Sequence, residues 1–230
     1  MIDRFEPRFS ILPDAQKRLW RSLHAAPSLG FVLYRGTAIA LRLGHRASVD
    51  FDFFSDRPLD KAGLAAAFPF IARSQLLQDQ PSTLTVNVPD EVNQEEHVKI
   101  SFFGSIGFGR YNSPETTVDG VLQVAALDDL MATKVKVLLQ RVEAKDYRDI
   151  AAMLKYGVAL DRGLSIARAM YGNQFQPAES LKAMTYFQGG DLNVLTAQEK
   201  RTLIEAARAV RELPQVVRQA SELAMVGEGG

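Results

Sequence analysis

The sequence contains no cysteine, which excludes disulfide bonds, thiolate nucleophiles and zinc sites built on cysteine. No stretch approaches the roughly 18 consecutive apolar residues that a membrane helix requires, and residues 1–10 do not lead from a positively charged start into an apolar run, as a secretory signal would. Histidine is scarce, and we assign none of the three histidines a catalytic role. The default expectation is a cytoplasmic protein without a membrane span.

The chain also lacks a net charge, since Lys plus Arg and Asp plus Glu each total 27. No global field therefore draws the protein to nucleic acid, and any RNA contact must come from a local patch. The best candidate is the window 134–148, where five basic residues accompany two acidic ones. The alternative interpretation of this window is a solvated helix face with ion pairs between neighbouring turns.

A turn between a strand and a helix is the first feature that indicates a chemistry. Residues 31–34 are apolar and β-prone, Gly36 follows, and residues 37–43 have a helical composition that ends near Gly44. The first N–H groups of a helix have no partner within the helix, and a glycine lets a ligand approach the backbone. Thr37 adds a hydroxyl that can cap the helix or bind phosphate. The turn therefore predicts an anion site.

Two aspartates follow on a short predicted strand. Residues 49–54 alternate polar with apolar, so Asp50 and Asp52 share one face. Two like charges on one strand face repel unless a cation lies between them, and a small set of hard oxygen ligands suits Mg²⁺ or Mn²⁺ together with substrate phosphates. The alternative is an exposed strand with solvated aspartates and buried phenylalanines; the glycine turn upstream favours the metal–nucleotide site.

At these motifs the chain resembles the AbiEii/AbiGii toxin branch of the nucleotidyltransferase superfamily. The resemblance spans roughly residues 31 to 157. Its first part combines the glycine turn with the Asp-Phe-Asp strand, and its second part is a lysine-bearing helix followed by a Lys-Asp-Tyr-Arg-Asp-Ile segment. The matching segments are 36–41, 43–46, 48–54, 129–134 and 145–150.

The resemblance implies a Mg-dependent enzyme that moves a nucleoside monophosphate from an NTP to an acceptor. Asp50 and Asp52 would hold the metal, and Gly36 and Thr37 would cradle the β- and γ-phosphates. Lys134 would reach the triphosphate and neutralise the charge on the leaving pyrophosphate. The other implied site residues are Arg46 and Ser48 as support for the aspartate strand, and Asp146 and Asp149 as support for the acceptor or the lysine.

The resemblance also implies partners. They are an RNA such as tRNA, or a protein, as the acceptor, and a separately encoded antitoxin. From spacing alone, Asp146 and Asp149 read equally well as ion-pair partners on a helix surface.

Two positions depart from the family pattern. Arg35 replaces the first turn glycine, and positive φ at a non-glycine residue there would cost about 1 kcal/mol; its guanidinium could instead supply charge to a triphosphate. The usual third carboxylate is also missing, because the strand predicted at 97–103 offers Lys99 and Ser101 on its polar face. Glu95 or Glu96, just before that strand, are the possible substitutes.

These departures support a second hypothesis, in which a catalytically degenerate nucleotidyltransferase fold serves as a binding or scaffold protein. A third hypothesis is an Asp-x-Asp glycosyltransferase that uses a nucleotide sugar. A single strand-glycine-helix unit before Asp50 is too little for a nucleotide-sugar fold, so this third hypothesis is the weakest.

The predicted fold is α/β (α+β): a nucleotidyltransferase-like mixed sheet flanked by helices in residues 1–126, followed by a C-terminal helical bundle in residues 127–230. We expect a helix over 13–25, a short helix opened by Pro58, a hairpin of strands 82–88 and 97–103, and a loop over 104–117. Residues 226–230 have the composition of a disordered end. The later helices are expected at 128–142, 145–156, 160–171, 177–187 and 196–212, the last with a capping box of Thr196 and Glu199 and an end at Pro214.

Overall fold

A single mixed sheet forms the first half of the protein in the computed structural model, which describes residues 3–225. Within that range the sheet has eight strands in the order β1-β7-β8-β2-β3-β6-β5-β4. The strands are β1 Arg4–Phe5, β2 Val32–Tyr34, β3 Asp50–Phe54, β4 Gln75–Gln80, β5 Thr83–Pro89, β6 His97–Phe103, β7 Glu115–Thr117 and β8 Gln123–Val124. The disordered end expected at 226–230 lies outside the described residues.

Phenylalanines anchor the centre of the sheet. Strand β3 runs parallel to β6 and antiparallel to β2. Its alternation buries Phe51 and Phe53, and the ring of Phe53 stacks on Phe102 of β6 with centroids 5.4 Å apart. The same alternation turns Asp50 and Asp52 toward the opposite face, as the period-two pattern predicts.

The expected hairpin is confirmed, because β5 and β6 pair in antiparallel register. Strand β4 was not expected from the sequence. Its six residues are all exposed, and it forms the edge of the sheet beside β5. An exposed polar edge strand carries no buried alternating face, so the sequence gives little sign of it.

The helices of the first half are short. They are α1 Asp14–Leu19, α2 Arg35–Leu43 and α3 Lys61–Ala67. Two expected boundaries are wrong: the helix expected over 13–25 tightens into a 3₁₀ turn at Trp20–Leu23, and α3 begins after Asp60, whose side chain caps it, and not at Pro58. Gly44 ends α2 with φ 67°, the left-handed conformation expected of a helix-terminating glycine.

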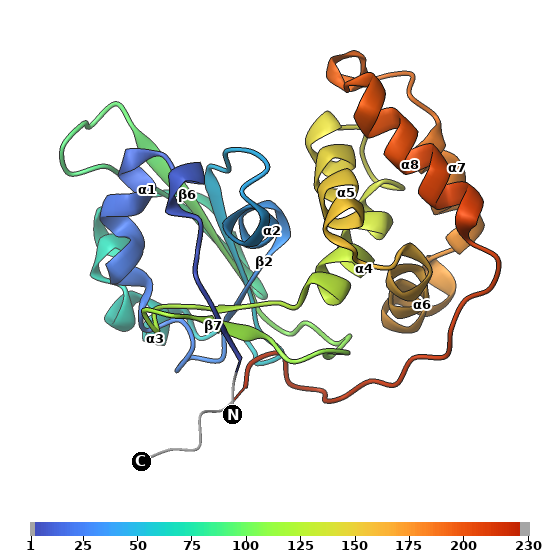
Figure 1. The fold of residues 1–230 in the computed structure, drawn as a ribbon. Helices are drawn as coiled ribbons and strands as arrows, with labels where there is room; N and C mark the ends of the chain where they lie inside the picture. The colour runs from blue at the N-terminus through green and yellow to red at the C-terminus, as the bar shows by residue number, and fades with distance from the viewer. Residues whose placement is uncertain (1–2, 226–230) are drawn as a thin grey trace.

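The second half is helical and lies beside the sheet half, joined to it through α4 (Figure 1). The helices are α4 Leu127–Val137, α5 Ala144–Tyr156, α6 Leu160–Tyr171, α7 Pro177–Thr185 and α8 Ala197–Ala209. The capping box of Thr196 and Glu199 is confirmed. Helix α4 ends five residues before its expected limit of 142, and α8 ends at Ala209, well before Pro214.

The segment after α8 returns to the sheet half (Figure 1). It forms an isolated bridge between Ala220 and Arg110, and the backbone N–H of Leu223 donates to the carboxylate of Asp56 at 2.9 Å. Leu223 is buried. This segment therefore holds the two halves together, and the two-domain boundary at 126/127 stays a prediction.

The mixed sheet with flanking helices, followed by a helical half, confirms the expected fold class. Across residues 3–225 no helix has both the length and the apolar character needed to cross a membrane.

Candidate active site

A cavity of about 510 Å³ opens where α2 begins, beside strands β3 and β6 and the helices α4 and α5. It gathers both sequence motifs, although they lie about eighty residues apart in the chain. Six basic and two acidic side chains line it, so its wall has an excess of positive charge. These charged residues are Arg35, Arg46, Lys99, Lys134, Arg141, Lys145, Asp50 and Asp52.

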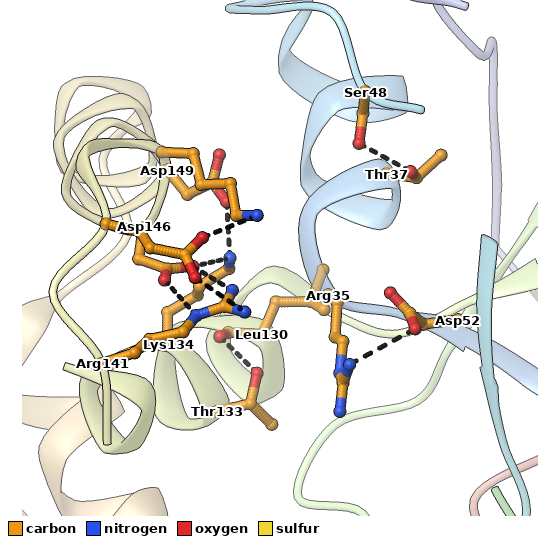
Figure 2. A network of polar contacts seen from close by, with 12 residues as sticks. Arg35, Thr37, Ser48, Asp52, Leu130, Thr133, Lys134, Arg141, Asp146 and Asp149 are labelled. Atoms are coloured by element: carbon orange, nitrogen blue, oxygen red, sulfur yellow. Dashed lines mark hydrogen bonds and ion pairs between the residues drawn. The ribbon is translucent and has the colours of Figure 1, made fainter. Parts of the chain in front are cut away.

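The strand-to-helix turn is fixed against β3 by hydroxyl groups. The hydroxyl of Thr37 donates to the backbone carbonyl of Asp50. It also lies 2.7 Å from the hydroxyl of Ser48 (Figure 2). Thr37 and Ser48 are both buried. The hydroxyl expected to bind phosphate is thus engaged inside the protein, where it sets the distance between α2 and the aspartate strand.

Asp50 and Asp52 line the cavity together, and each lies near one cation. The Oδ2 atom of Asp50 is 3.3 Å from the Nζ atom of Lys99, and the Oδ1 atom of Asp52 is 3.3 Å from the Nη1 atom of Arg35. The side chain of Asp50 is 34% exposed and that of Asp52 only 11%. Burial raises the pKa of Asp52 above its ordinary value, and the nearby charge of Arg35 only partly opposes that shift.

Arg35 has φ 61°, so the position does require the left-handed conformation that glycine adopts freely. Strand pairing explains its contact with Asp52: Tyr34 faces Asp52 in the β2–β3 register, and Arg35 follows directly. Its guanidinium also lies over the rings of Phe103 and Phe54, with its central carbon 4.7 and 5.5 Å from their centroids. These cation–π contacts and the ion pair with Asp52 offset part of the free-energy cost of the left-handed backbone conformation at Arg35.

The neighbouring strand supplies no third acid. In the parallel register Asp50 faces Lys99 and Asp52 faces Ser101. Within residues 3–225 no group of three or more acidic or histidine side chains is placed to share a metal. Glu95 and Glu96 do not line the cavity, and Glu96 lies 3.8 Å from Arg18 instead.

The two aspartates nevertheless fit a divalent cation. Their second oxygens, Oδ1 of Asp50 and Oδ2 of Asp52, accept no hydrogen bond from a described residue. Mg²⁺ commonly takes one or two carboxylates and completes its octahedron with water and substrate phosphates. Arg35 only partly offsets the cost of burying the charge of Asp52, so a bound cation would stabilise the ionised carboxylate.

Lys134 on α4 lies in the wall of the cavity and is almost fully buried. Its Nζ atom is 2.6 Å from the Oδ1 atom of Asp146 and 2.6 Å from the Oδ2 atom of Asp149, both on α5. Both carboxylates are fully buried, so the alternative of surface ion-pair partners is wrong. The structure instead places both acids around the lysine.

Two arginines extend this network around the buried acids; Figure 2 shows Lys134, Arg141, Asp146 and Asp149 close together, with Asp52 to one side. Arg46 holds Asp149 through two hydrogen bonds of 2.6 and 2.9 Å, and Arg141 holds Asp146 through two of 2.8 and 3.1 Å. Burial by itself would raise the pKa of each acid, but these cations and Lys134 outweigh it and lower both pKa values. Arg46 therefore supports α5, and not the aspartate strand as expected.

Arg141 and His45 were not among the site residues selected from the sequence. The Nε2 atom of His45 lies 2.7 Å from the Oδ1 atom of Asp149, and Arg141 lines the cavity from the loop between α4 and α5. Arg141 lies in the basic window 134–148, and its place in that window is the feature of the sequence that could have identified it as a site residue. His45 stands directly beside Arg46, but no spacing rule links either residue to an acid about a hundred positions later.

Comparisons with known proteins identify the family. The model of a family described as "Nucleotidyl transferase AbiEii toxin, Type IV TA system" matches residues 18–213. Uncharacterized protein aq_aa25 of Aquifex aeolicus (strain VF5) is 28% identical over 180 residues, which cover 75% of this chain and 83% of that relative.

The fold is also similar to that of a solved structure. MenT4, a nucleotidyltransferase toxin from Mycobacterium tuberculosis H37Rv, superposes with a TM-score of 0.59 at 14% sequence identity, covering 86% of this chain and 84% of that chain. At this identity the likeness shows the fold alone. The family model, by contrast, extends over most of the sequence and contains both motifs that meet in the cavity, and the chain therefore belongs to the AbiEii family of nucleotidyltransferase toxins of type IV toxin–antitoxin systems.

Proposed function

We propose that the protein transfers a nucleoside monophosphate from an NTP to an acceptor hydroxyl. The acceptor oxygen attacks the α-phosphorus, the bond from that phosphorus to the bridging oxygen breaks, and pyrophosphate and a proton are released. The observation that carries the proposal is the single cavity in which Asp50, Asp52 and Lys134 lie together with five further cations. A pair of acids among so many cations suits a metal-bound polyphosphate.

In this proposal Asp50 and Asp52 hold Mg²⁺, or Mn²⁺ in its place. When bound, the ion supplies a Lewis acid that neutralises charge on the phosphates. The unpaired N–H groups in the first turn of α2, at Gly36 and Thr37, face the triphosphate. Arg35 leaves its ion pair with Asp52 and binds a phosphate oxygen, which its rigid fork of donors suits.

Lys134 supplies positive charge to the leaving pyrophosphate from the wall of the cavity. Asp146 and Asp149 hold this ammonium in place, because both carboxylates lie 2.6 Å from it. A charge positioned in advance needs no reorganisation during the reaction. Arg46 and Arg141 hold these two acids in position by hydrogen bonds. Ser48 contacts the hydroxyl of Thr37 and so helps to position the turn.

The acceptor in this proposal is an RNA, tRNA-like, or a protein, and the transfer makes the protein the toxin of a toxin–antitoxin system with a cognate antitoxin. The exposed cations at the rim of the cavity support an anionic acceptor: Lys145 is 47% exposed and Arg141 41%. NTP and tRNA are cytoplasmic, so the proposal places the reaction there.

The position of a radioactive label tests the reaction. The protein is incubated with Mg²⁺ and each of the four NTPs, labelled at the α- or the γ-phosphate, together with total RNA or total protein as the acceptor pool. Nucleotidyl transfer labels the acceptor from the α-phosphate only. Label that arrives from the γ-phosphate would identify a kinase and reject the proposal.

Variants locate the reaction at the site. Asp52→Asn should abolish the labelling, whereas Asp79→Asn, at an exposed aspartate paired with Lys61, should retain it. Full activity in Asp52→Asn would reject the metal role of that residue.

A second candidate function is a scaffold protein without catalysis. Two observations favour it: Arg35 stands beside Asp52 at the point where a metal would bind, and the guanidinium of Arg46 fills the space in front of Gly36. Calorimetry with each NTP and Mg²⁺ separates the two functions. Binding that is lost in the Asp50→Ala, Asp52→Ala double variant supports the enzyme, and no binding of any NTP supports the scaffold.

A further inference from the structure

Lys99 occupies a position that the proposed reaction leaves unexplained. It lies on β6 directly opposite Asp50 in the parallel register, and its Nζ atom is 3.3 Å from the Oδ2 atom of Asp50. Its side chain is 43% exposed and lines the same cavity. An ammonium group therefore stands inside the carboxylate site, on the side of Asp50 that faces β6.

The charges at the aspartate pair balance with a single ion. The two carboxylates contribute two negative charges, which one divalent cation neutralises. Lys99 and Arg35 contribute two positive charges, one beside each carboxylate, which equal the charge of a second divalent cation. A second metal ion beside Asp50 would repel the Lys99 ammonium at close range and would have no further acid among the described residues to bind it.

We infer that this chain binds one divalent cation at Asp50 and Asp52, and that Lys99, helped by Arg35, takes the place of a second. The ammonium of Lys99 already contacts the Oδ2 atom of Asp50, the oxygen that a second ion beside Asp50 would need as a ligand. The inference rests on the proposed function, because it takes the aspartates as metal ligands.

Unlike a second metal ion, the ammonium of Lys99 cannot dissociate from the site. It is attached to the protein at every metal concentration, so one ion saturates the site. Once that ion holds the aspartates, Lys99 and Arg35 are free to bind the oxygens of the triphosphate.

Binding of Mn²⁺ alone tests the inference without any measurement of activity. Electron paramagnetic resonance counts the free ion during a titration of the full chain. We expect one bound Mn²⁺ per wild-type chain and two per Lys99→Asp chain, because the substitution removes the ammonium and adds a third carboxylate beside Asp50. Circular dichroism and the thermal midpoint establish that the variant is folded.

Two further variants separate position from total charge. Lys145→Asp makes the same charge change at the rim of the cavity, where Lys145 pairs with Glu143, and should still bind one ion. Lys99→Met removes the charge but adds no ligand, so it should bind one ion about tenfold more tightly than wild type. This variant keeps the test decisive if Lys99→Asp does not fold.

Two bound ions in the wild type would overturn the inference while leaving the proposed function intact. So would one ion in folded Lys99→Asp, two ions in Lys145→Asp, or an unchanged affinity in Lys99→Met. No bound Mn²⁺ in any of these proteins would instead count against the proposed function itself, and the inference would fall with it.

Discussion

The guanidinium of Arg46 donates two hydrogen bonds, 2.6 and 2.9 Å long, to the carboxylate of Asp149. Arg46 lies in the loop between α2 and β3, and Asp149 lies on α5, so this pair joins the sheet half to the helical half. Asp149 also binds Lys134 at 2.6 Å. The position of the catalytic lysine candidate therefore depends on the contact between the two halves.

Asp149→Asn should destabilise the fold strongly. The substitution leaves the buried ammonium of Lys134 and the guanidinium of Arg46 with less negative charge, and breaking a buried ion pair from one side costs about 3–5 kcal/mol. Urea unfolding at pH 7 measures the change. A loss below about 1 kcal/mol, the size typical of an exposed pair, would contradict the structural role given to this carboxylate.

The same variant should change the response to acid. The pKa of Asp149 is lower in the folded protein than in the unfolded chain, so its ionised form adds stability above the unfolded pKa of about 3.9, and that stability is lost as pH falls below this value. The wild type should lose more free energy of unfolding than Asp149→Asn between pH 5 and 3. Equal losses in the two proteins would show that Asp149 does not titrate as described.

Asp52→Asn should stabilise the protein while it removes the proposed activity. Burial raises the pKa of Asp52 above its unfolded value, so its charge at neutral pH opposes folding, and the neutral amide should raise the free energy of unfolding by about 1 kcal/mol. Mg²⁺ should stabilise the wild type but not the variant, because only the wild type binds the ion in its folded state. Thermal unfolding with and without Mg²⁺ measures both effects. A variant less stable than the wild type would contradict the claim that the buried charge of Asp52 opposes folding.

Two substitutions at Arg35 isolate its backbone strain. Arg35→Gly and Arg35→Ala both remove the ion pair with Asp52 and the contacts with Phe103 and Phe54, but only glycine adopts φ 61° freely. The glycine variant should be more stable than the alanine variant by about 1 kcal/mol. Denaturant unfolding compares them, and equal stability would mean that the turn relaxes.

Gly36→Ala should disturb the site through a neighbour. A Cβ atom at this position would collide with the Nη2 atom of Arg46, so the guanidinium must move away from Asp149. We expect weaker Mg²⁺–NTP binding and lower stability by about 1–3 kcal/mol. Gly107→Ala is the matched control, since nothing lies within 4 Å of the added methyl group; equal effects in both variants would mean that close packing at Gly36 is unimportant.

The local features of the site could be predicted from the sequence because neighbours in the chain decide them. Alternation placed Asp50 and Asp52 on one face of β3, and Gly44 ended α2. Helix ends were less predictable: α4 stops at Val137 although residues 138–142 continue its composition. Intrinsic helix propensity is a weak determinant of where a helix ends.

The contacts between distant segments could not be predicted. The basic window 134–148 is not one exposed face: Lys134 is buried against Asp146, while Lys145 stays exposed at the cavity. Asp149 meets His45 and Arg46 only because α5 packs against α2.

Three features follow from the sequence without the structure: the turn at Gly36, the shared face of Asp50 and Asp52, and, through the two motifs, the family. These depend on backbone geometry within a few residues and on the order of motifs along the chain. Three other features required the folded protein: Lys99 lies opposite Asp50, Arg35 pairs with Asp52, and two buried acids hold Lys134. Strand register and helix packing set these pairings, and charge interactions act through space between residues that the chain separates.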